Sequence, residues 1–325
     1  MRCFFMSRIY LEPLDQLKQL NAELHPILDQ LTSPLIIVGG QSVSYWVDYY
    51  KDSINTIQTE GIASADIDFM MSNRSDIVLV AKSWELEAQF AGEGTQPPSV
   101  AIVALVEPDG KGIKTDKQGA QFVDFSKLNL SGEEHANIVD FIDAPAGFTT
   151  KELKAPKKRL LLTEQYLFPL DANGEEELQS HEKLLILNPL GCLKSRIANL
   201  LKTNKNKDLE IQRIKALCLP VYFFIQELSM ERSPREVKHY YDELINLICS
   251  EEGVQVLIHH GFDLRNLLID TLHLPNQPDK FYELELPNII KKLNDKFDRR
   301  LAAHEKFLRV KAEKKAKALL VGKLS

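Results

Sequence analysis

The feature that most constrains this chain is a pair of aspartates inside an apolar run. Asp66 and Asp68 are separated by one residue in Ser64-Ala65-Asp66-Ile67-Asp68-Phe69-Met70. Side chains alternate along a β-strand, so the two carboxylates are expected to project from the same face. Like charges held this close repel one another unless a cation lies between them. The pattern therefore predicts a strand whose acidic edge binds a cation.

A second pattern lies upstream, where the apolar run 35–38 ends in Gly39-Gly40-Gln41-Ser42 and helical spacing follows. Glycine lets the backbone approach a ligand closely, and the start of a helix offers free N–H groups to an anion. Gln41 and Ser42 are expected to add side-chain donors. Together, the two patterns predict a nucleoside triphosphate held on magnesium, with Asp66 and Asp68 as ligands of the ion.

A nucleotidyl transfer site also needs a third carboxylate on a neighbouring strand, which shares a second ion and faces the attacking hydroxyl. Asp124 in Gln121-Phe122-Val123-Asp124-Phe125 and Asp140 in Asn137-Ile138-Val139-Asp140-Phe141-Ile142 both fit this description. Periodicity alone does not separate these two candidates.

The coarse pattern predicts an α+β fold, a mixed sheet with flanking helices, followed by an all-helical C-terminal domain. Strands are expected at 35–38, 67–71, 100–106, 120–125, 136–142, 160–162 and 184–187, helices at 11–31, 41–50 and 76–90, and a loop at 54–63. Helical stripes then follow at 190–201, 209–228, 234–249, 252–260, 264–272 and 286–320. This change of pattern places the domain boundary near residue 186, giving domains 1–186 and 187–325.

The ordered set Gly-Gly-Gln-Ser, Asp-Ile-Asp-Phe and Val-Asp-Phe-Ile resembles the nucleotidyltransferase superfamily with the polymerase-β-like fold. More narrowly, it is similar to the bacterial nucleotidyltransferases of abortive-infection and toxin–antitoxin systems. The helix that begins Asn188-Pro189-Leu190-Gly191-Cys192-Leu193 and the pair Lys207-Asp208 extend this resemblance, which covers roughly residues 35–215.

The resemblance implies that Asp140 is the third carboxylate, because an apolar-Gly-apolar stretch follows it at 146–148. Two departures from the family pattern bear on the acceptor pocket. The gap from Gly40 to Asp66 is longer than in the minimal motif, and a strand-like segment is inserted around Asp124.

The resemblance implies a magnesium-dependent nucleotidyltransferase that moves a nucleoside monophosphate from a triphosphate such as ATP to an acceptor hydroxyl. The acceptor would be an RNA end (a tRNA, for example) or a protein, and the role a toxin or phage-defence function with an antitoxin as partner. In this interpretation Asp66, Asp68 and Asp140 bind metal and catalyse, Gly39, Gly40, Gln41 and Ser42 contact the β- and γ-phosphates, and Lys194 or Arg196 neutralises charge.

Alternatives remain open. The same fold also serves enzymes that modify a small molecule such as an aminoglycoside, and a catalytically silent nucleotide-binding regulator would keep the same residues. Lys194 and Arg196 equally suit ordinary solvated charges on a helix, and Lys202, Lys205 and Lys207 are expected to lie in a solvated loop.

Charge is unevenly distributed along the chain. The net charge is -6, yet residues 291–325 hold twelve Lys and Arg against four Asp and Glu. This basic helix suits RNA binding through phosphates without sequence choice, a solvated helix end, or a surface for a partner. The four cysteines form no C-x-x-C pair, which fits a reducing compartment. No apolar run approaches the roughly 18 residues of a membrane helix, so a cytoplasmic location without membrane contact is expected.

Overall fold

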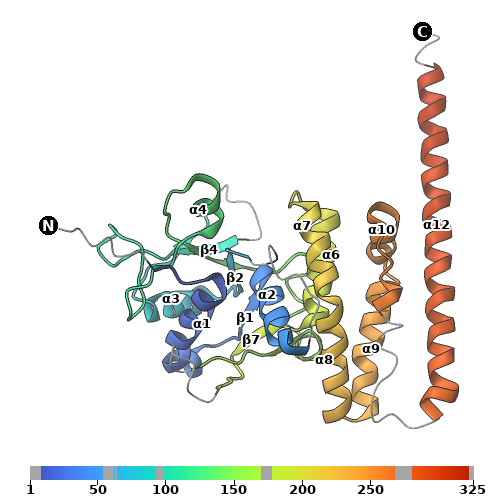
Figure 1. Ribbon diagram of the computed structural model, residues 1–325. Helices are drawn as coiled ribbons and strands as arrows, with labels where there is room; N and C mark the ends of the chain where they lie inside the picture. The colour runs from blue at the N-terminus through green and yellow to red at the C-terminus, as the bar shows by residue number, and fades with distance from the viewer. Residues whose placement is uncertain are drawn as a thin grey trace. The chain divides into compact units, whose positions relative to one another are not determined.

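The structure is a computed structural model that describes residues 9–53, 62, 64–92, 99–169, 178–267 and 280–321. Its internal contacts divide the chain into two units, residues 1–221 and 222–325 (Figure 1). The boundary expected near residue 186 lies inside the first unit. The reason is that helix α6 (Pro189–Lys202) contacts strand β7 (Leu184–Leu187) and helix α7 (Lys207–Ala216), so both helices group with the sheet.

The first unit is an α+β structure, as expected. Its remaining strands are β1 (Leu35–Val38), β2 (Ile67–Met70), β3 (Gln89–Phe90), β4 (Ser99–Ala104), β5 (Ile138–Ile142) and β6 (Thr163–Gln165). Its remaining helices are α1 (Pro13–Leu24), η1 (His25–Gln30), α2 (Gly39–Tyr49), η2 (Lys51–Ser53), α3 (Arg74–Ser83), α4 (Phe125–Ser131) and α5 (Pro156–Leu162).

The described strands form one seven-stranded mixed sheet in the order β3-β4-β5-β2-β1-β7-β6. Strand β2 pairs in parallel with β5 and antiparallel with β1, while β1 pairs in parallel with β7. The two central strands β1 and β2 therefore connect early segments of the chain to strands that come about 70 to 150 residues later. Helix α2, which links β1 to the segment before β2, contacts both strands and helix α6.

Alternation along β2 and β5 separates the core from the polar face. Phe69 and Phe141 are both fully buried, and their rings stack with centroids 6.0 Å apart. Trp84 closes this cluster at 6.3 Å from Phe141 and donates its ring N–H to the Leu20 carbonyl at 3.0 Å. The residues that precede and follow each phenylalanine along its strand face the opposite side of the sheet, and they include Asp68 and Asp140.

Several expected elements are wrong in type or extent. Segment 120–125 is not a strand, because it makes only isolated bridges and Asp124 caps helix α4. Residues 160–162 end helix α5. The helix expected over 76–90 stops at Ser83 and leads through Glu85, whose φ is 61°, into strand β3. The helix expected over 209–228 is two helices, α7 and α8 (Cys218–Glu231). The loop at 54–63 and the helix at 264–272 lie largely outside the described residues.

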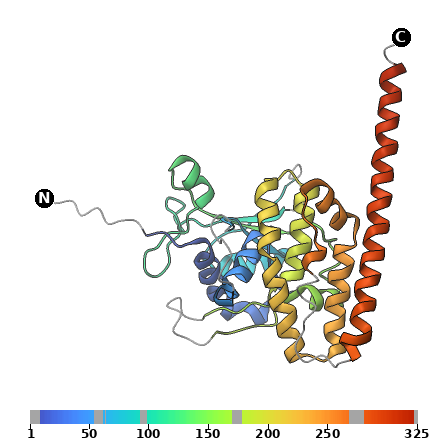
Figure 2. The same cartoon turned by 45° about the vertical axis from the view of Figure 1, so that its right-hand side comes forward.

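The second unit is helical, as expected. It contains most of α8, then α9 (Pro234–Ile248), α10 (Glu251–His260), η3 (Phe281–Glu285) and α12 (Leu286–Val321). A capping box starts α9, in which Ser233 and Glu236 satisfy one another's backbone N–H groups. Figure 2 shows α12 continuing well past α9 and α10 of the same unit. Among the described helices, none combines the length and the apolar composition needed to cross a membrane.

Candidate functional site

Asp68 and Asp140 lie side by side in the sheet. In the parallel pair of β2 and β5, Asp68 is in register with Asp140, and both side chains are half-buried. Asp66 is exposed and lies just before the first residue of β2. Side chains of residues in register on neighbouring strands share a face. The structure therefore places Asp68 and Asp140 on one face of the central strands, and Asp66 lies close enough for its charge to raise the pKa of both.

Two of these carboxylates, Asp68 and Asp140, are harder to ionise than usual. Burial is the main cause that raises the pKa of Asp68 to about 6; the charge of Lys205 opposes this rise, and the nearby charges of Asp66 and Asp140 add to it. Burial also raises the pKa of Asp140, with the Asp66 charge adding to the effect and a hydrogen bond from the Ser99 hydroxyl, 2.7 Å long, opposing it. A carboxylate with a raised pKa is one whose negative charge lacks full compensation. This face of the sheet therefore carries unbalanced negative charge.

Gly39 brings the start of helix α2 against Asp68. Its φ is +73°, a conformation that favours glycine, and a Cβ at this position would lie 2.0 Å from Asp68 Oδ2. A Cβ on Gly40 would lie 2.3 Å from the Ser64 Cβ. Among the described residues no side chain caps the N-terminus of α2, so its first N–H groups lack a partner within the helix. The two glycines thus let a helix start, with its positive dipole end, lie next to the aspartates.

The side chains of Gln41 and Ser42 are not available as the phosphate donors expected from the sequence. Both residues are fully buried. The Gln41 amide donates to the carbonyls of Ser64 at 2.6 Å and Pro13 at 3.2 Å, and the Ser42 hydroxyl donates to the Gly39 carbonyl at 2.9 Å. These bonds hold the segment before Asp66 and the turn at Gly39 in place. Any contact of these two residues with an anion must come from their backbone N–H groups.

Asp124 and Asp140 occupy different environments. The Asp124 carboxylate accepts hydrogen bonds from the backbone N–H groups of Ser126 and Lys127, and the Ser126 hydroxyl also donates to it. These bonds hold the pKa of Asp124 below its ordinary value despite its burial. Asp124 is thus fully used as the N-cap of α4. The structure groups Asp140, not Asp124, with Asp66 and Asp68.

A buried ion cluster lies behind the glycines. Arg196 and Glu210, with 2% and 1% of their side-chain surface exposed, approach to 3.4 Å, and Arg213 bonds to Glu210 at 3.0 Å. Arg213 also donates from Nε to the Ile62 carbonyl at 3.3 Å, and its Nη2 lies 3.2 Å from where a Gly40 Cβ would stand. The solvated alternative for Arg196 is therefore wrong. Its guanidinium faces protein partners, and Nε is buried without one among the described residues.

Glu210 and Arg213 were not predicted as site residues from the sequence. A signal was present, because they stand three residues apart in helix α7, where opposite charges meet on one face. It did not stand out, since such pairs are usually exposed and of little consequence. Burial distinguishes this pair from the others, and burial depends on the tertiary structure.

Of the lysines considered from the sequence, Lys194 and Lys207 are placed differently from expectation, whereas Lys205 lies in an exposed loop as expected. Lys194 pairs with Glu152 and lies over the Phe148 ring, 4.4 Å from its centroid, so its charge is already partnered. Lys205, expected to be a solvated loop residue, is exposed, yet its positive charge lowers the pKa of both Asp68 and Asp140 against the effect of burial. Lys207 donates to the carbonyls of Leu200 and Thr203 at the end of α6. Lys205 is therefore the lysine whose charge faces the aspartates.

The carboxylate oxygens of this site suit a hard divalent cation that also binds the phosphate oxygens of a ligand. Across the described residues, no three histidine, cysteine or acidic side chains converge as a complete metal site. Magnesium, however, binds through one or two carboxylates and takes its remaining ligands from water and phosphate oxygens. The only partly compensated charge of Asp68 and its register with Asp140 suit such an ion.

Comparisons of this chain with models of protein families, with curated proteins and with solved structures found no match.

Proposed function

We propose that this protein is a magnesium-dependent nucleotidyltransferase with the polymerase-β-like fold of that superfamily. Its site lies on the face of the sheet where Asp68 of β2 and Asp140 of β5 stand in register. The observation that carries the proposal is the register of Asp68 with Asp140, next to a helix start that Gly39 brings into contact with Asp68. A site of this kind offers opposite charges on two sides. The carboxylates attract divalent cations, and the N-terminus of α2 attracts phosphate oxygens.

In the proposed reaction, a nucleoside triphosphate lies with its β- and γ-phosphates at the backbone N–H groups of residues 39–42. Asp66 and Asp68 would hold magnesium, with Asp140 as a further ligand, and the ion supplies charge neutralisation on the phosphates. An acceptor hydroxyl oriented by Asp140 attacks the α-phosphorus and loses its proton to solvent. The bond from the α-phosphorus to the bridging oxygen breaks, and pyrophosphate leaves with the electron pair.

Fixed positive charge around this position supports the proposal. Arg196 and Arg213 lie buried behind Gly40 and Asp68, and Lys205 lies on the solvent side. In this proposal the arginines act on the phosphates through their field, because their guanidinium groups are bound to Glu210, whereas Lys205 is able to contact a phosphate directly. We propose Lys205 in the role that the sequence interpretation gave to Lys194.

The test is label transfer. The full-length protein is incubated with each α-labelled nucleoside triphosphate, magnesium and total RNA, and labelled products are separated on gels that also resolve protein. Asp66→Ala, Asp68→Ala and Asp140→Ala should each reduce transfer about 10²–10³-fold. Asp143→Ala, which removes a partly exposed aspartate paired with Lys154, is the matched control and should retain activity. Asp124→Asn should also retain activity, because that residue caps α4.

Absence of transfer to any RNA or protein, with all four triphosphates, would contradict the proposal. Magnesium-dependent stabilisation by a triphosphate without transfer would instead indicate a silent nucleotide-binding regulator. A role as a toxin or in phage defence, with an antitoxin partner, follows from the sequence resemblance alone and would be examined by expressing wild type and Asp68→Ala in growing cells.

A further inference from the structure

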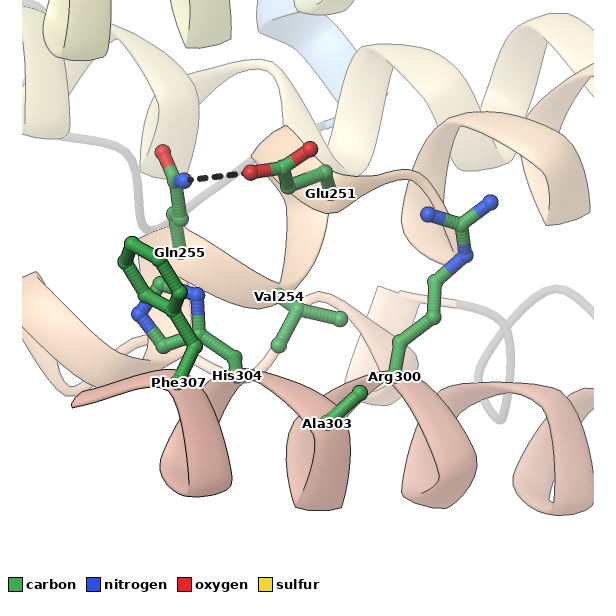
Figure 3. A pocket seen from close by; sticks show the side chains of 7 residues that line it. All are labelled: Glu251, Val254, Gln255, Arg300, Ala303, His304 and Phe307. Carbon is green, nitrogen blue, oxygen red and sulfur yellow. Dashed lines mark hydrogen bonds between the residues drawn. The ribbon is translucent and has the colours of Figure 1, made fainter. Parts of the chain in front are cut away.

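The second unit contains a cavity between helices α10 and α12. It has a volume of about 310 Å³ and is lined by Glu251, Val254 and Gln255 of α10 and by Arg300, Ala303, His304 and Phe307 of α12 (Figure 3). This volume is at the lower end of that of pockets for small organic ligands. The cavity lies entirely within the second unit, and none of its residues belongs to the carboxylate site.

The wall of this cavity combines flat rings with polar groups. Phe307 is 60% exposed, and its ring lies 6.4 Å from that of His304. The Nε2 atom of His304 is buried and has no hydrogen-bond partner among the described residues. The Gln255 amide donates to Glu251 at 3.3 Å, as Figure 3 shows, and no donor to its side-chain carbonyl oxygen is found among the described residues. An exposed phenyl ring and a half-buried imidazole beside polar atoms suit a flat heteroaromatic ligand.

The helix beyond the cavity is strongly basic and exposed. Residues 305–317 of α12 are all exposed, and they carry six Lys and Arg against two Glu. Lys311 and Lys314 follow Phe307 at positions i+4 and i+7, which places them on the same helix face one and two turns further along. Figures 1 and 2 show the C-terminal end of α12 extending past α10 of the same unit. Positively charged side chains therefore follow the cavity along the same face of α12.

We infer that this surface binds single-stranded RNA, with one unstacked base in the cavity against Phe307 and His304 and the following phosphates along Lys311 and Lys314. Single strands offer bases that leave the stack, and aromatic side chains beside a basic track are the usual way to hold them. An acidic peptide would match the lysines but would leave the rings and the Nε2 atom of His304 without a partner. The inference deepens the proposed function, on which it rests for RNA as the acceptor class.

The experiment uses the full-length protein and a fluorescein-labelled ten-nucleotide single-stranded RNA, with binding followed by anisotropy. Phe307→Ala should weaken binding roughly tenfold or more, since stacking on an aromatic side chain is lost. An abasic strand of the same length should bind wild type and Phe307→Ala equally. Leu284→Ala, which removes another exposed apolar side chain of the same unit, should bind as wild type does. Circular dichroism checks that each variant is folded.

The phosphate track is tested separately. Lys311→Gln combined with Lys314→Gln should lower the slope of log affinity against log salt by about 1.4, as expected for two lost phosphate contacts on a single strand. The inference would be overturned if Phe307→Ala bound the RNA as tightly as wild type, or if Phe307→Ala weakened binding of the abasic strand as much as that of the normal strand. It would also be overturned if duplex RNA bound more tightly than the single strand, or if polyglutamate bound as tightly as RNA. The binding assay contains no triphosphate, so label transfer is measured independently of it. Loss of RNA binding at this surface would refute the inference alone, whereas RNA binding without label transfer would refute the proposed function alone.

Discussion

Two aspartates of the first unit, Asp76 and Asp68, show opposite ways of placing a carboxylate near the sheet. Asp76, which is 2% exposed, accepts hydrogen bonds from the backbone and hydroxyl groups of both Thr32 and Ser33, at 2.8 to 3.1 Å. These bonds outweigh the effect of burial and hold the pKa of Asp76 below its ordinary value. Asp68 has no such donors among the described residues, and like charges lie near it. Its pKa is raised to about 6.

The difference teaches that residue type and burial do not by themselves decide whether a charge stabilises a fold. Asp76 gains donors for its ionised form, so its negative charge favours the folded state. For Asp68, burial has a desolvation cost that the charges of Lys205 and Arg196 offset only in part. Proteins retain such groups chiefly where function requires them, which is why Asp68 and not Asp76 marks a candidate site.

The largest effect is expected from Gly39→Ala, which forces a Cβ into the position next to Asp68 Oδ2. Backbone strain at positive φ adds to displacement of the carboxylate, and we expect a loss of about 2–4 kcal/mol in the free energy of unfolding. Gly110→Ala is the matched control, because Gly110 has a φ of +72° but nothing within 4 Å of an added Cβ. It should cost about 1–2 kcal/mol. Urea denaturation measures both variants. If Gly39→Ala and Gly110→Ala lowered the free energy of unfolding equally, the carboxylate of Asp68 would not be in close contact with Gly39.

Asp76→Ala should be nearly as severe, with an expected loss of about 2–3 kcal/mol. The change removes a charged acceptor and leaves the hydroxyl and N–H groups of Thr32 and Ser33 to find other partners. Asp48→Ala, which removes a surface aspartate paired with Lys51, should change the free energy of unfolding by less than about 0.5 kcal/mol. Denaturation at pH 7.5 measures both variants. If Asp76→Ala and Asp48→Ala lowered the free energy of unfolding equally, the hydrogen bonds from Thr32 and Ser33 would not be what stabilises ionised Asp76.

Asp68→Asn should have the opposite sign and stabilise the metal-free protein by about 1–2 kcal/mol at pH 7.5. The change removes an ionised group that the folded state disfavours, with a similar side-chain volume. The measurement is denaturation in EDTA, with Asp143→Asn as control. The same variant should lose any stabilisation that wild type gains from magnesium and a nucleoside triphosphate. Destabilisation by Asp68→Asn would mean that the charge of Asp68 is compensated after all.

The smallest and sharpest effect is the pH dependence of that gain. The folded-state pKa of Asp68, about 6, lies above its ordinary value of 3.8, so ionised Asp68 costs stability above pH 6. The advantage of Asp68→Asn over wild type should therefore be full at pH 7.5, shrink as the pH falls through 6, and vanish near pH 3.8. Unfolding of both proteins along this pH series, in EDTA, provides the check. An advantage that stays constant would exclude titration of Asp68 as its source.

Strong local patterns were sufficient to predict the central strands. The apolar runs at 35–38, 67–71 and 184–187 became β1, β2 and β7 within one residue, because short apolar runs bounded by glycine, proline or polar residues have few other ways to be buried. Segments 120–125 and 160–162 failed for a related reason. A short apolar run also fits a loop or a helix end, and tertiary contacts decided between them.

The candidate site was predictable in part. The spacing of Asp66 and Asp68 and the glycines before α2 were visible as patterns, whereas the choice between Asp124 and Asp140 from the residues alone was not. It depended on which segment pairs with β2, a contact about 70 residues away along the chain. Gln41 and Ser42 were expected to face a ligand, but their side chains lie in the core, since a helix start that packs on the sheet buries them.

The sequence by itself determined which groups carry charge, where glycine permits an unusual backbone, and which short runs must be buried, because these properties belong to single residues and their near neighbours. Only the tertiary structure decided that Asp140 stands beside Asp68, that Arg196 and Arg213 share a buried partner in Glu210, and that the Lys205 charge faces the aspartates. Those relations depend on distances between remote segments and on the low dielectric of a packed interior, and both arise only when the chain is folded.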